Sequence, residues 1–322
     1  MPLYLQIKHN PFTTIFITIV VFILNSSFSY AQESQIESEQ TKIHSNTKKS
    51  SPAGSLTTGS KLETIFTEPV NQLKQRQQDI KYYHQATAEI RPLLVGTDEY
   101  ITLIKNQTSA NNRGVMILLP DWQQGVNNPK AMNYLRNTLP ALGWNTIAIQ
   151  SDNKPNNYPS TALSPVDQAK DNKLNITAYK NKLSALLNAV MNTAKQYPGI
   201  VVVIAQGNNA AMLVELYEIK STEAPEALVM LSSFRESSPN FINDINTEFA
   251  RQLAQSDIPT LDLYLRYDNP TVLAKAKQRK IFAEQAIKVN YRQRQLNNTA
   301  TGYFPKKELV KQITGWLKVI EH

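Results

Sequence analysis

Short apolar runs alternate with longer amphipathic segments over most of the chain from residue 90 onward. The apolar runs indicate strands of a buried sheet, and the segments between them repeat apolar residues every three or four positions, as helices do. The predicted strands lie at residues 114–119, 144–149, 200–204, 228–231 and 260–265. This alternation predicts a mostly parallel sheet with helices on both faces.

Further elements are predicted at the edges and in the middle of this series. Residues 93–104 indicate a hairpin at the sheet edge. A strand with one solvated face is expected at residues 287–292, and a last helix at 305–319. Residues 150–174 are rich in Asn and Pro and are expected to form either a lid or a disordered loop, with the next helix starting near Ile176.

The first 31 residues have the three parts of a secretory signal peptide. Lys8 precedes an apolar run over residues 12–24, and a polar stretch ends in Ser29-Tyr30-Ala31. We therefore expect cleavage after Ala31 and export, with the periplasm as the destination. An uncleaved anchor is the alternative, but thirteen helical residues span only about 20 Å of a hydrocarbon core roughly 30 Å thick.

Residues 32–60 are rich in Ser, Thr, Gln, Lys and Glu and are predicted to be a disordered linker. Residues 61–322 then form one α/β domain, which opens with an extra N-terminal helical segment at 62–90. The absence of cysteine excludes disulfides, thiolate metal sites and lipid attachment to an N-terminal cysteine. Because no phosphate-binding, zinc or calcium motif is present, we expect neither a cofactor nor a metal.

The net charge of +8 is concentrated near the C-terminus. Residues 271–322 contain eleven Lys and Arg against three Glu, which gives a net charge of +8, so the charges of the preceding residues sum to zero. These basic residues either form ordinary solvated faces or bind an anionic lipid or lipopolysaccharide surface, and no nucleic acid partner is expected. The candidates for such a surface are Lys275, Lys277, Arg279, Lys280, Arg292 and Arg294.

Three short motifs carry a resemblance to a known family. They are Gly114-Val115-Met116-Ile117-Leu118-Leu119-Pro120-Asp121-Trp122, Leu139-Pro140-Ala141-Leu142-Gly143-Trp144-Asn145-Thr146 and Ile313-Thr314-Gly315-Trp316-Leu317. Together with the order of the predicted elements, they resemble the bacterial family catalogued as domain of unknown function 3530. The resemblance implies an α/β-hydrolase-like fold, but it implies no activity because the motifs are mostly structural.

In the α/β-hydrolase fold the nucleophile lies on a sharp turn between a strand and a helix. Here that turn is expected within residues 205–211, and the nucleophile position falls on Gly207. A shifted frame would place Asn209 there, and an amide is not a nucleophile. Glycine adopts the strained backbone of such a turn without penalty, so it stabilises the turn while removing the reactive hydroxyl.

Of the two other positions in the expected catalytic triad, the acid has a candidate residue and the histidine does not. Asp268 follows the strand at 260–265, where the acid is expected, but it could also form a turn or cap a helix. The loop before the last helix, residues 296–304, contains no histidine. Among the four histidines, His84 is the one catalytic candidate, and its alternative role is that of a surface or packing histidine.

Other candidates lie in the loops at strand ends. Asp121 belongs to the loop that normally supplies the oxyanion hole and could act as an acid or a base, and Trp122 could stack on a ligand ring. Both could instead be structural. Ser232 could expose a hydroxyl or simply end a strand. Gln206 and Asn208, on either side of the expected turn, are candidate ligand-binding residues.

The favoured hypothesis is an exported, non-catalytic α/β-hydrolase-like protein that binds a ligand or partner in the cell envelope. It rests on the loss of two triad positions at once, without which the usual acyl transfer has no mechanism. The alternative is an esterase-like hydrolase with a non-standard site. That site would draw on Asp121, His84, Ser232 or Asp268.

Overall fold

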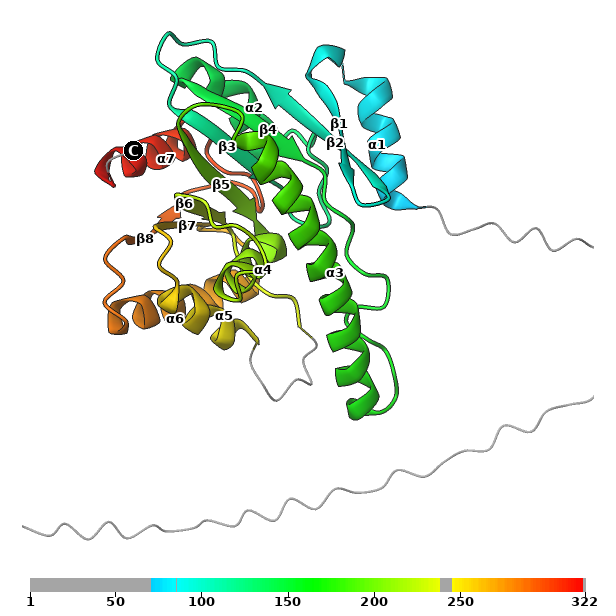
Figure 1. Ribbon diagram of the computed structural model, residues 1–322. Helices are drawn as coiled ribbons and strands as arrows, with labels where there is room; N and C mark the ends of the chain where they lie inside the picture. Colours follow the sequence, from blue (N-terminus) through cyan, green and yellow to red (C-terminus); the bar gives the residue numbers. More distant parts are fainter. Residues whose placement is uncertain (1–70, 85, 238–244, 321–322) are drawn as a thin grey trace, which may run out of the picture. The chain divides into compact units, whose positions relative to one another are not determined.

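The computed structural model describes residues 71–84, 86–237 and 245–320 (Figure 1). Contacts along the chain separate Met1–Thr64 from Ile65–His322, and the described fold is that of the second unit. The predicted signal segment at 1–31, the predicted linker at 32–60 and the first part of the predicted N-terminal helical segment lie outside the described residues.

An eight-stranded sheet forms the centre of this unit, in the order β1-β2-β4-β3-β5-β6-β7-β8. The strands are β1 (Ile90–Val95), β2 (Asp98–Lys105), β3 (Gly114–Leu119), β4 (Trp144–Ile149), β5 (Ile200–Gln206), β6 (Ala227–Leu231), β7 (Thr260–Leu265) and β8 (Tyr291–Leu296). β2 pairs antiparallel with β1 and β4, and all other neighbours are parallel. The predicted edge hairpin and the mostly parallel sheet are therefore confirmed.

Helices cover both faces of the sheet, as predicted (Figure 1). They are α1 (Gln72–Tyr83), α2 (Ala131–Thr138), α3 (Pro165–Ala194), α4 (Gly207–Glu218), α5 (Ile245–Gln255), α6 (Pro270–Gln285) and α7 (Lys306–Val319), with short 3-10 turns at Thr87–Glu89 and Leu139–Leu142. α3, α4 and α5 pack on one face, and α2 and α7 on the other. In the described ranges, no helix is both long and apolar enough to cross a membrane.

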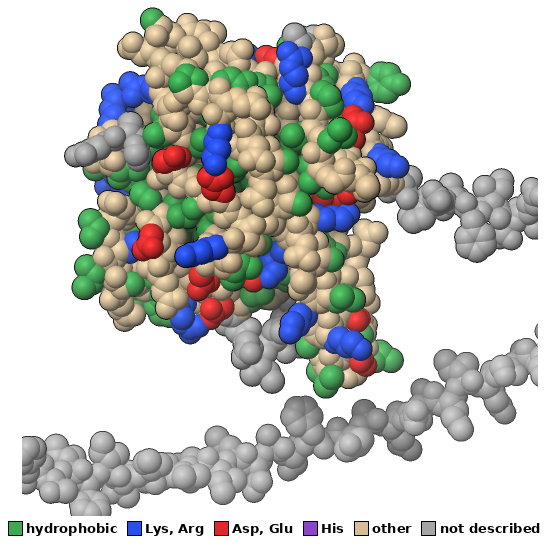
Figure 2. All heavy atoms as spheres, in the orientation of Figure 1, with side chains coloured by type: hydrophobic (Ala, Val, Ile, Leu, Met, Phe, Trp, Pro, Cys, Tyr) green, Lys and Arg blue, Asp and Glu red, His purple; other side chains and the backbone are tan. Residues whose placement is uncertain are grey.

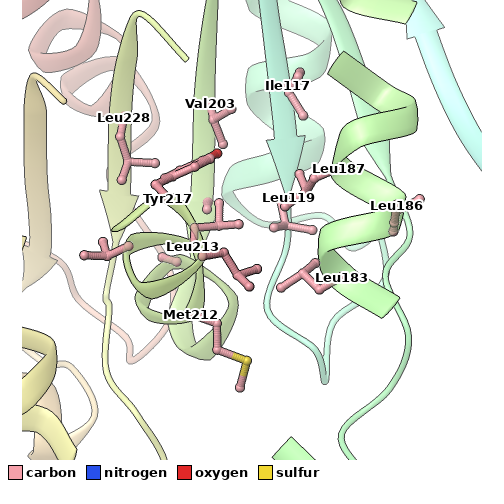
Figure 3. Close-up of a cluster of buried hydrophobic side chains, with 14 of the residues drawn as sticks. Ile117, Leu119, Leu183, Leu186, Leu187, Val203, Met212, Leu213, Tyr217 and Leu228 are labelled. Carbon is pink, nitrogen blue, oxygen red and sulfur yellow. The ribbon is translucent and has the colours of Figure 1, made fainter. Parts of the chain in front are cut away.

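The strands contribute side chains to two apolar clusters, because neighbouring residues of a strand point to opposite faces of the sheet. On β3, Val115, Ile117 and Leu119 belong to the cluster under α3 and α4, whereas Met116 and Leu118 belong to the cluster under α2 and α7. Figure 3 shows the first cluster, where side chains of α3 and α4 meet β3 and β5. Burial on both faces explains why these strands are unbroken apolar runs in the sequence.

The segment at 150–174 differs from its prediction as a lid or a disordered loop. Only its first part is a loop, because α3 begins at Pro165 and continues for 30 residues. The Ser164 side chain caps this helix by accepting a hydrogen bond from the Val166 N–H at 3.3 Å, and proline is favoured in the first turn. Asn172 is the one buried residue of α3 before Ile176, so the apolar spacing predicted the helix only from Ile176.

The strand predicted at 287–292 is also corrected. β8 begins at Tyr291 and pairs with β7 from there to Leu296. Ile287 instead lies just after α6, where its φ is +53° and its side chain is 81% exposed. The apolar alternation at the start of the predicted strand therefore belongs to an exposed turn and not to the sheet.

A buried ion pair joins β7 to α6. The side chains of Asp262 and Arg279 are both 0% exposed, and Arg279 Nε donates to Asp262 Oδ2 at 2.8 Å. The same carboxylate accepts hydrogen bonds from Tyr291 and Gln293 of β8, at 3.0 and 2.9 Å. This geometry corrects the assignment of Arg279 to an anionic-surface site, because its guanidinium faces the interior of the domain.

Arg279→Met is expected to lower the free energy of unfolding by about 3–5 kcal/mol, because it leaves the Asp262 carboxylate buried without its cation. Urea denaturation measures this loss. Lys280→Met, on the same helix, is the matched control, since Lys280 is exposed and its 3.7 Å contact with Glu284 should contribute less than about 1 kcal/mol. Equal losses for the two variants would contradict the stabilising role of the buried pair.

Candidate functional site

The turn predicted to carry the nucleophile lies where β5 ends at Gln206 and α4 begins at Gly207. Gly207 is buried and has a φ of +60°, in the left-handed region that favours glycine. β5 lies in the middle of the sheet between β3 and β6, so the turn sits at the carboxyl edge of the parallel strands. The structure thus follows the frame centred on Gly207 and not the one centred on Asn209.

The carboxylate of Asp121 occupies the space that a side chain at position 207 would need. A Cβ atom built on Gly207 would lie 2.5 Å from Asp121 Cγ and 2.6 Å from its Oδ1. Non-bonded carbon atoms normally approach only to about 3.5–4.0 Å, so no side chain fits unless Asp121 moves. Asp121 Oδ1 also accepts the backbone N–H of Asn208 at 2.8 Å, a donor that could otherwise face an oxyanion.

Burial raises the pKa of Asp121 to about 6, from an ordinary value of 3.8. The loss of hydration outweighs hydrogen bonds from the backbone N–H groups of Asn208, Trp122 and Asn209, which favour the ionised form. Asp121 is 9% exposed. A carboxyl group with a pKa near 6 can serve chemically as an acid, as a base or as a fixed hydrogen-bond acceptor.

Asn209 crosslinks three segments around this turn. Its Nδ2 donates to the Pro120 carbonyl at 2.7 Å and to Ser151 Oγ at 3.1 Å, and its Oδ1 accepts from the Tyr179 hydroxyl at 2.8 Å. These bonds hold the loop after β3, the loop after β4 and helix α3 against the start of α4. Sequence reasoning missed this role, because nothing in the local spacing distinguishes a crosslinking amide from a solvated one.

Trp122 is packed inside the domain. Its side chain is 1% exposed, and its ring meets those of Tyr158 and Tyr179 edge-on, with centroids 5.8 and 5.4 Å apart. Its indole Nε1 has no hydrogen-bond partner among the described residues. The indole is thus covered by neighbouring side chains in this structure, and the assignment of Trp122 as a stacking residue stays a prediction.

The structure brings Ser232 and Asp268 together. Ser232 Oγ donates to Asp268 Oδ2 at 2.5 Å, and Ser232 has a φ of +49°, an unusual value for serine. The same Asp268 oxygen accepts the backbone N–H of Leu265 at 2.8 Å, while its other oxygen accepts that of Asn269 at 2.7 Å. Asp268 thus lies after β7 as predicted, and it also forms the turn that was its alternative role.

The loop after β8, where the histidine of the fold was expected, is closed by Asn298. Its Oδ1 accepts the Tyr267 N–H at 2.8 Å, and its Nδ2 donates to the carbonyls of Tyr267 and Ala300 at 3.0 and 2.7 Å. The side chain therefore joins the loops after β7 and β8. An amide can bridge two backbone segments in this way, but it cannot shuttle a proton as an imidazole does.

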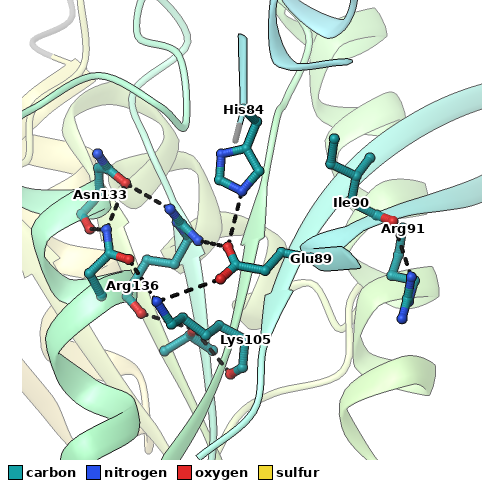
Figure 4. Close-up of polar contacts among 9 residues, drawn as sticks. His84, Glu89, Ile90, Arg91, Lys105, Asn133 and Arg136 are labelled. Atoms are coloured by element: carbon teal, nitrogen blue, oxygen red, sulfur yellow. Dashed lines mark hydrogen bonds and ion pairs between the residues drawn. The ribbon is translucent and has the colours of Figure 1, made fainter. Parts of the chain in front are cut away.

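His84 lies in a separate cluster beside α2, on the face of the sheet opposite α4 (Figure 4). Its Nε2 is 3.0 Å from Glu89 Oε2, and the Glu89 carboxylate also binds Arg136 and Lys105. Burial alone would raise the pKa of Glu89, but the positive charges and hydrogen bonds around it lower that pKa below its ordinary value. Within the described residues, His84 is hydrogen-bonded to none of the other catalytic candidates.

Gln206 and Asn208, the residues on either side of Gly207, are both buried. Asn208 Oδ1 accepts the backbone N–H of Glu236 at 2.6 Å, whereas Gln206 Oε1 has no hydrogen-bond partner in the described part of the chain. Their assignment as ligand-binding residues stays a prediction. No group of three or more His, Asp and Glu that could hold a metal occurs among residues 71–84, 86–237 and 245–320.

The remaining basic candidates lie at the surface: Lys277, Lys280 and Arg294 are exposed, and Lys275 and Arg292 are half-buried. On the face shown in Figure 2, basic and acidic side chains are interspersed. Binding of these five residues to an anionic surface stays a prediction.

The raised pKa of Asp121 predicts a pH dependence of stability. The unfolded chain releases this proton near pH 3.8 and the folded protein near 6, so the carboxyl lowers stability as pH rises between these values. The expected loss between pH 5 and 7 is roughly 1 kcal/mol. Because the pKa values of Glu89 and Glu215 are lowered, their contributions change below about pH 4.5, outside this window.

Urea denaturation at pH 5 and pH 7 measures this effect. Asp121→Asn keeps an acceptor for the Asn208 N–H but cannot ionise, so it should remove the loss between the two pH values. Asp98→Asn, at an exposed position of β2, is the matched control and should keep the wild-type dependence. An unchanged dependence in Asp121→Asn would show that another group causes it.

Gly207→Ser is expected to destabilise the protein more than Gly96→Ser. The two glycines have nearly equal φ values of +60° and +61°, so they share a conformational cost of about 1–3 kcal/mol. A Cβ at Gly96 meets no atom within 4 Å, whereas one at Gly207 meets Asp121. In an Asp121→Gly background, where the carboxylate is absent, Gly207→Ser should cost no more in urea denaturation than Gly96→Ser costs in the wild type. Equal losses of unfolding free energy in the two single variants would mean that the Asp121 side chain moves away from position 207 at no cost in stability.

Two of the solved structures that are similar to this domain illustrate the match. TT1662 from Thermus thermophilus matches with a TM-score of 0.50 and 12% identity, over 71% of this chain and 98% of its own. Esterase 2 from Thermogutta terrifontis, in a structure phosphoramylated by tabun, matches with a TM-score of 0.50 and 10% identity, over 74% of this chain and 97% of its own. At this identity the likeness shows the fold alone. None of the curated protein sequences compared with the chain is significantly similar to it.

The family model described as "Protein of unknown function (DUF3530)" matches residues 13–319. This match includes the whole sheet, the turn at Gly207 and the three motifs that carried the resemblance in sequence. The domain has the predicted α/β-hydrolase-like fold. The chain therefore belongs to the DUF3530 family.

Proposed function

We propose that this protein is a non-catalytic member of the α/β-hydrolase fold that binds a ligand or a partner in the cell envelope. The observation that carries the proposal is the position of Asp121, whose carboxylate fills the space beside Gly207 and accepts the Asn208 N–H. Protein atoms thus fill the point where a substrate carbonyl would meet a nucleophile and an oxyanion hole. The envelope location rests on the signal peptide predicted at residues 1–31.

The hydrogen bonds of Asp121 support a structural use of the turn. An oxyanion hole works by presenting donors to a charge that develops during the reaction, so those donors must be available to substrate. Here the N–H groups of Asn208 and Asn209 are directed at the Asp121 carboxylate. A substrate oxyanion would have to displace a group that is itself an anion above about pH 6.

The remaining candidates also favour a protein without acyl-transfer chemistry. Ser232 donates to Asp268, but among the described residues neither side chain is hydrogen-bonded to a histidine. A serine hydroxyl needs a base that can take up its proton, and an ionised aspartate alone is a weak one. Asn298 lies in the loop where the fold's histidine would stand, and its amide is fully engaged with backbone groups.

A second candidate function is a hydrolase in which Asp121 is catalytic. The observation in its favour is the pKa of about 6, which suits a general acid or base near neutral pH. In that mechanism Asp121 would turn toward a ligand and release the Asn208 N–H. The two functions differ in whether the protein shows turnover and in whether that turnover depends on Asp121.

The purified protein is expected to show no covalent labelling by a fluorophosphonate probe and no hydrolysis of p-nitrophenyl acetate or butyrate above the buffer rate. An active serine esterase under the same conditions is the positive control. Labelling that disappears in Ser232→Ala would contradict the proposal. Turnover that is lost in Asp121→Asn and kept in Asp98→Asn would establish the second candidate instead.

A further inference from the structure

The turn between α6 and β8 exposes two aliphatic side chains. Ile287 is 81% and Val289 is 86% exposed, and together with Lys288 they form what we call the apolar tip. Figure 1 shows this connection at the periphery of the fold. Because α6 joins two parallel strands, it begins at the carboxyl edge of the sheet and ends at the other edge. The apolar tip therefore lies at the edge of the sheet opposite the turn at Gly207.

The backbone of Ile287 has a conformation that isoleucine disfavours. Helix α6 ends in a Schellman motif, in which the Lys288 N–H donates to the Ala283 carbonyl at 2.9 Å and the Ile287 N–H to the Glu284 carbonyl at 3.1 Å. The position of Ile287 in this motif usually holds glycine, because its φ is positive, and here φ is +53°. A β-branched residue is an outlier at such a value. Ile287 thus has neither a favourable backbone nor a buried side chain in the described structure.

Lys288, between the two aliphatic residues, is directed back toward the protein. It is half-buried, and its Nζ donates to the Ser256 carbonyl in the loop after α5. Burial lowers the pKa of Lys288 to about 8, against the opposing effect of the nearby Asp257 carboxylate. The side chains that the apolar tip presents to solvent are therefore those of Ile287 and Val289.

Basic side chains flank the apolar tip. Lys280 lines the same pocket as both aliphatic side chains of the tip, and Lys277 lies one turn earlier on the same face of α6. Residues 277–294 contain six Lys and Arg and one Glu. Arg279 is neutralised by its buried partner, and Asp257 offsets one further charge, so a net charge of +3 remains. The surroundings of the tip therefore favour an anionic surface.

A second pair of exposed aliphatic residues lacks this positive charge. Leu163 and Val166, at the start of α3, are 102% and 75% exposed. In residues 163–174 two lysines and two aspartates cancel each other. Since α3 follows β4, its start lies at the carboxyl edge of the sheet, opposite the apolar tip. What distinguishes the tip is thus the combination of exposed aliphatic side chains with an excess of positive charge.

We infer that the apolar tip binds the surface of an anionic phospholipid bilayer, with Ile287 and Val289 inserted at the boundary between headgroups and acyl chains. Lys277 and Lys280 then lie near the headgroup phosphates. Burial of a small apolar surface and attraction to anionic lipid act together in such peripheral binding. A turn with two exposed aliphatic side chains is too small for a stable protein interface, which buries about 800 Å² on each partner. The inference goes beyond the proposed function and uses no residue of the turn at Gly207.

Co-sedimentation with lipid vesicles measures this binding. At pH 7 and 0.1 M NaCl, the purified full chain is expected to bind vesicles of equal parts phosphatidylglycerol and phosphatidylcholine. Its affinity for vesicles of phosphatidylcholine alone should be at least about tenfold weaker, because the electrostatic contribution is absent. Binding to the mixed vesicles should also weaken at 0.5 M NaCl, since the Debye length shortens from about 10 Å to roughly 4 Å.

Two pairs of matched variants locate the surface. Ile287→Asn/Val289→Asn should lower the affinity for mixed vesicles at least about tenfold, because two aliphatic side chains contribute more than that factor even when partly inserted. Leu163→Asn/Val166→Asn makes the same change at the second exposed pair and should stay within about twofold of the wild type.

Lys277→Gln/Lys280→Gln should also lower this affinity at least about tenfold, because one lysine near an anionic surface contributes about fivefold. Lys170→Gln/Lys173→Gln, at exposed positions of α3 with the same spacing, removes the same net charge and should stay within about twofold of the wild type.

Ile287→Asn alone separates binding from folding. Asparagine tolerates a positive φ better than isoleucine, so this variant should unfold at a higher urea concentration than the wild type. Its affinity for mixed vesicles should nevertheless fall. A loss of binding in a more stable protein cannot result from unfolding.

No binding of the wild type to mixed vesicles, equal affinity for the two lipid compositions, or equal affinity of the tip and control variants would overturn this inference. All variants share the same N-terminal residues, so vesicle binding through those residues would give equal affinities. Each of these results leaves the proposed function standing. Fluorophosphonate labelling or ester turnover would overturn the proposed function instead, because those tests probe the opposite edge of the sheet.

Discussion

The contact between the Asp121 carboxylate and the backbone N–H groups at the start of α4 is the interaction on which the arrangement of this site depends. Removing a carboxylate from water costs free energy, and this cost raises the pKa of Asp121 to about 6. The cost is tolerated because the N-terminus of α4 offers donors in a fixed position. This contact requires glycine at position 207, since a Cβ there would lie within 2.6 Å of the carboxylate. The buried position of Asp121 and the glycine at position 207 thus depend on each other.

Three asparagines fix further loops along the carboxyl edge of the sheet. Asn208 holds the loop after β6, Asn209 holds the loops after β3 and β4 together with α3, and Asn298 joins the loops after β7 and β8. An amide both donates and accepts, so a single side chain can satisfy two backbone segments without any change of charge. These loops are thus held in place by side-chain amides, which carry no charge near neutral pH.

The sheet could be predicted from sequence because its strands are buried on both faces, which leaves unbroken apolar runs such as β3 and β5. The first half of α3 could not, since its solvated turns lack apolar spacing, and its one local signal is the capping pair Ser164-Pro165. Arg279 was misassigned because a buried arginine in a basic stretch reads like its exposed neighbours. Its partner Asp262 lies on another element, 17 residues away.

The site itself was only half predictable for the same reason. The residue types at the turn and the missing histidine can be read from the chain, but the contact of Asp121 with Asn208 joins residues 87 positions apart. The same limit applies to Asn298, whose hydrogen bonds to the backbone of Tyr267 join residues 31 positions apart. Local pattern therefore predicts which residue types stand at the turn, whereas the contacts that fix them exist only in the assembled sheet.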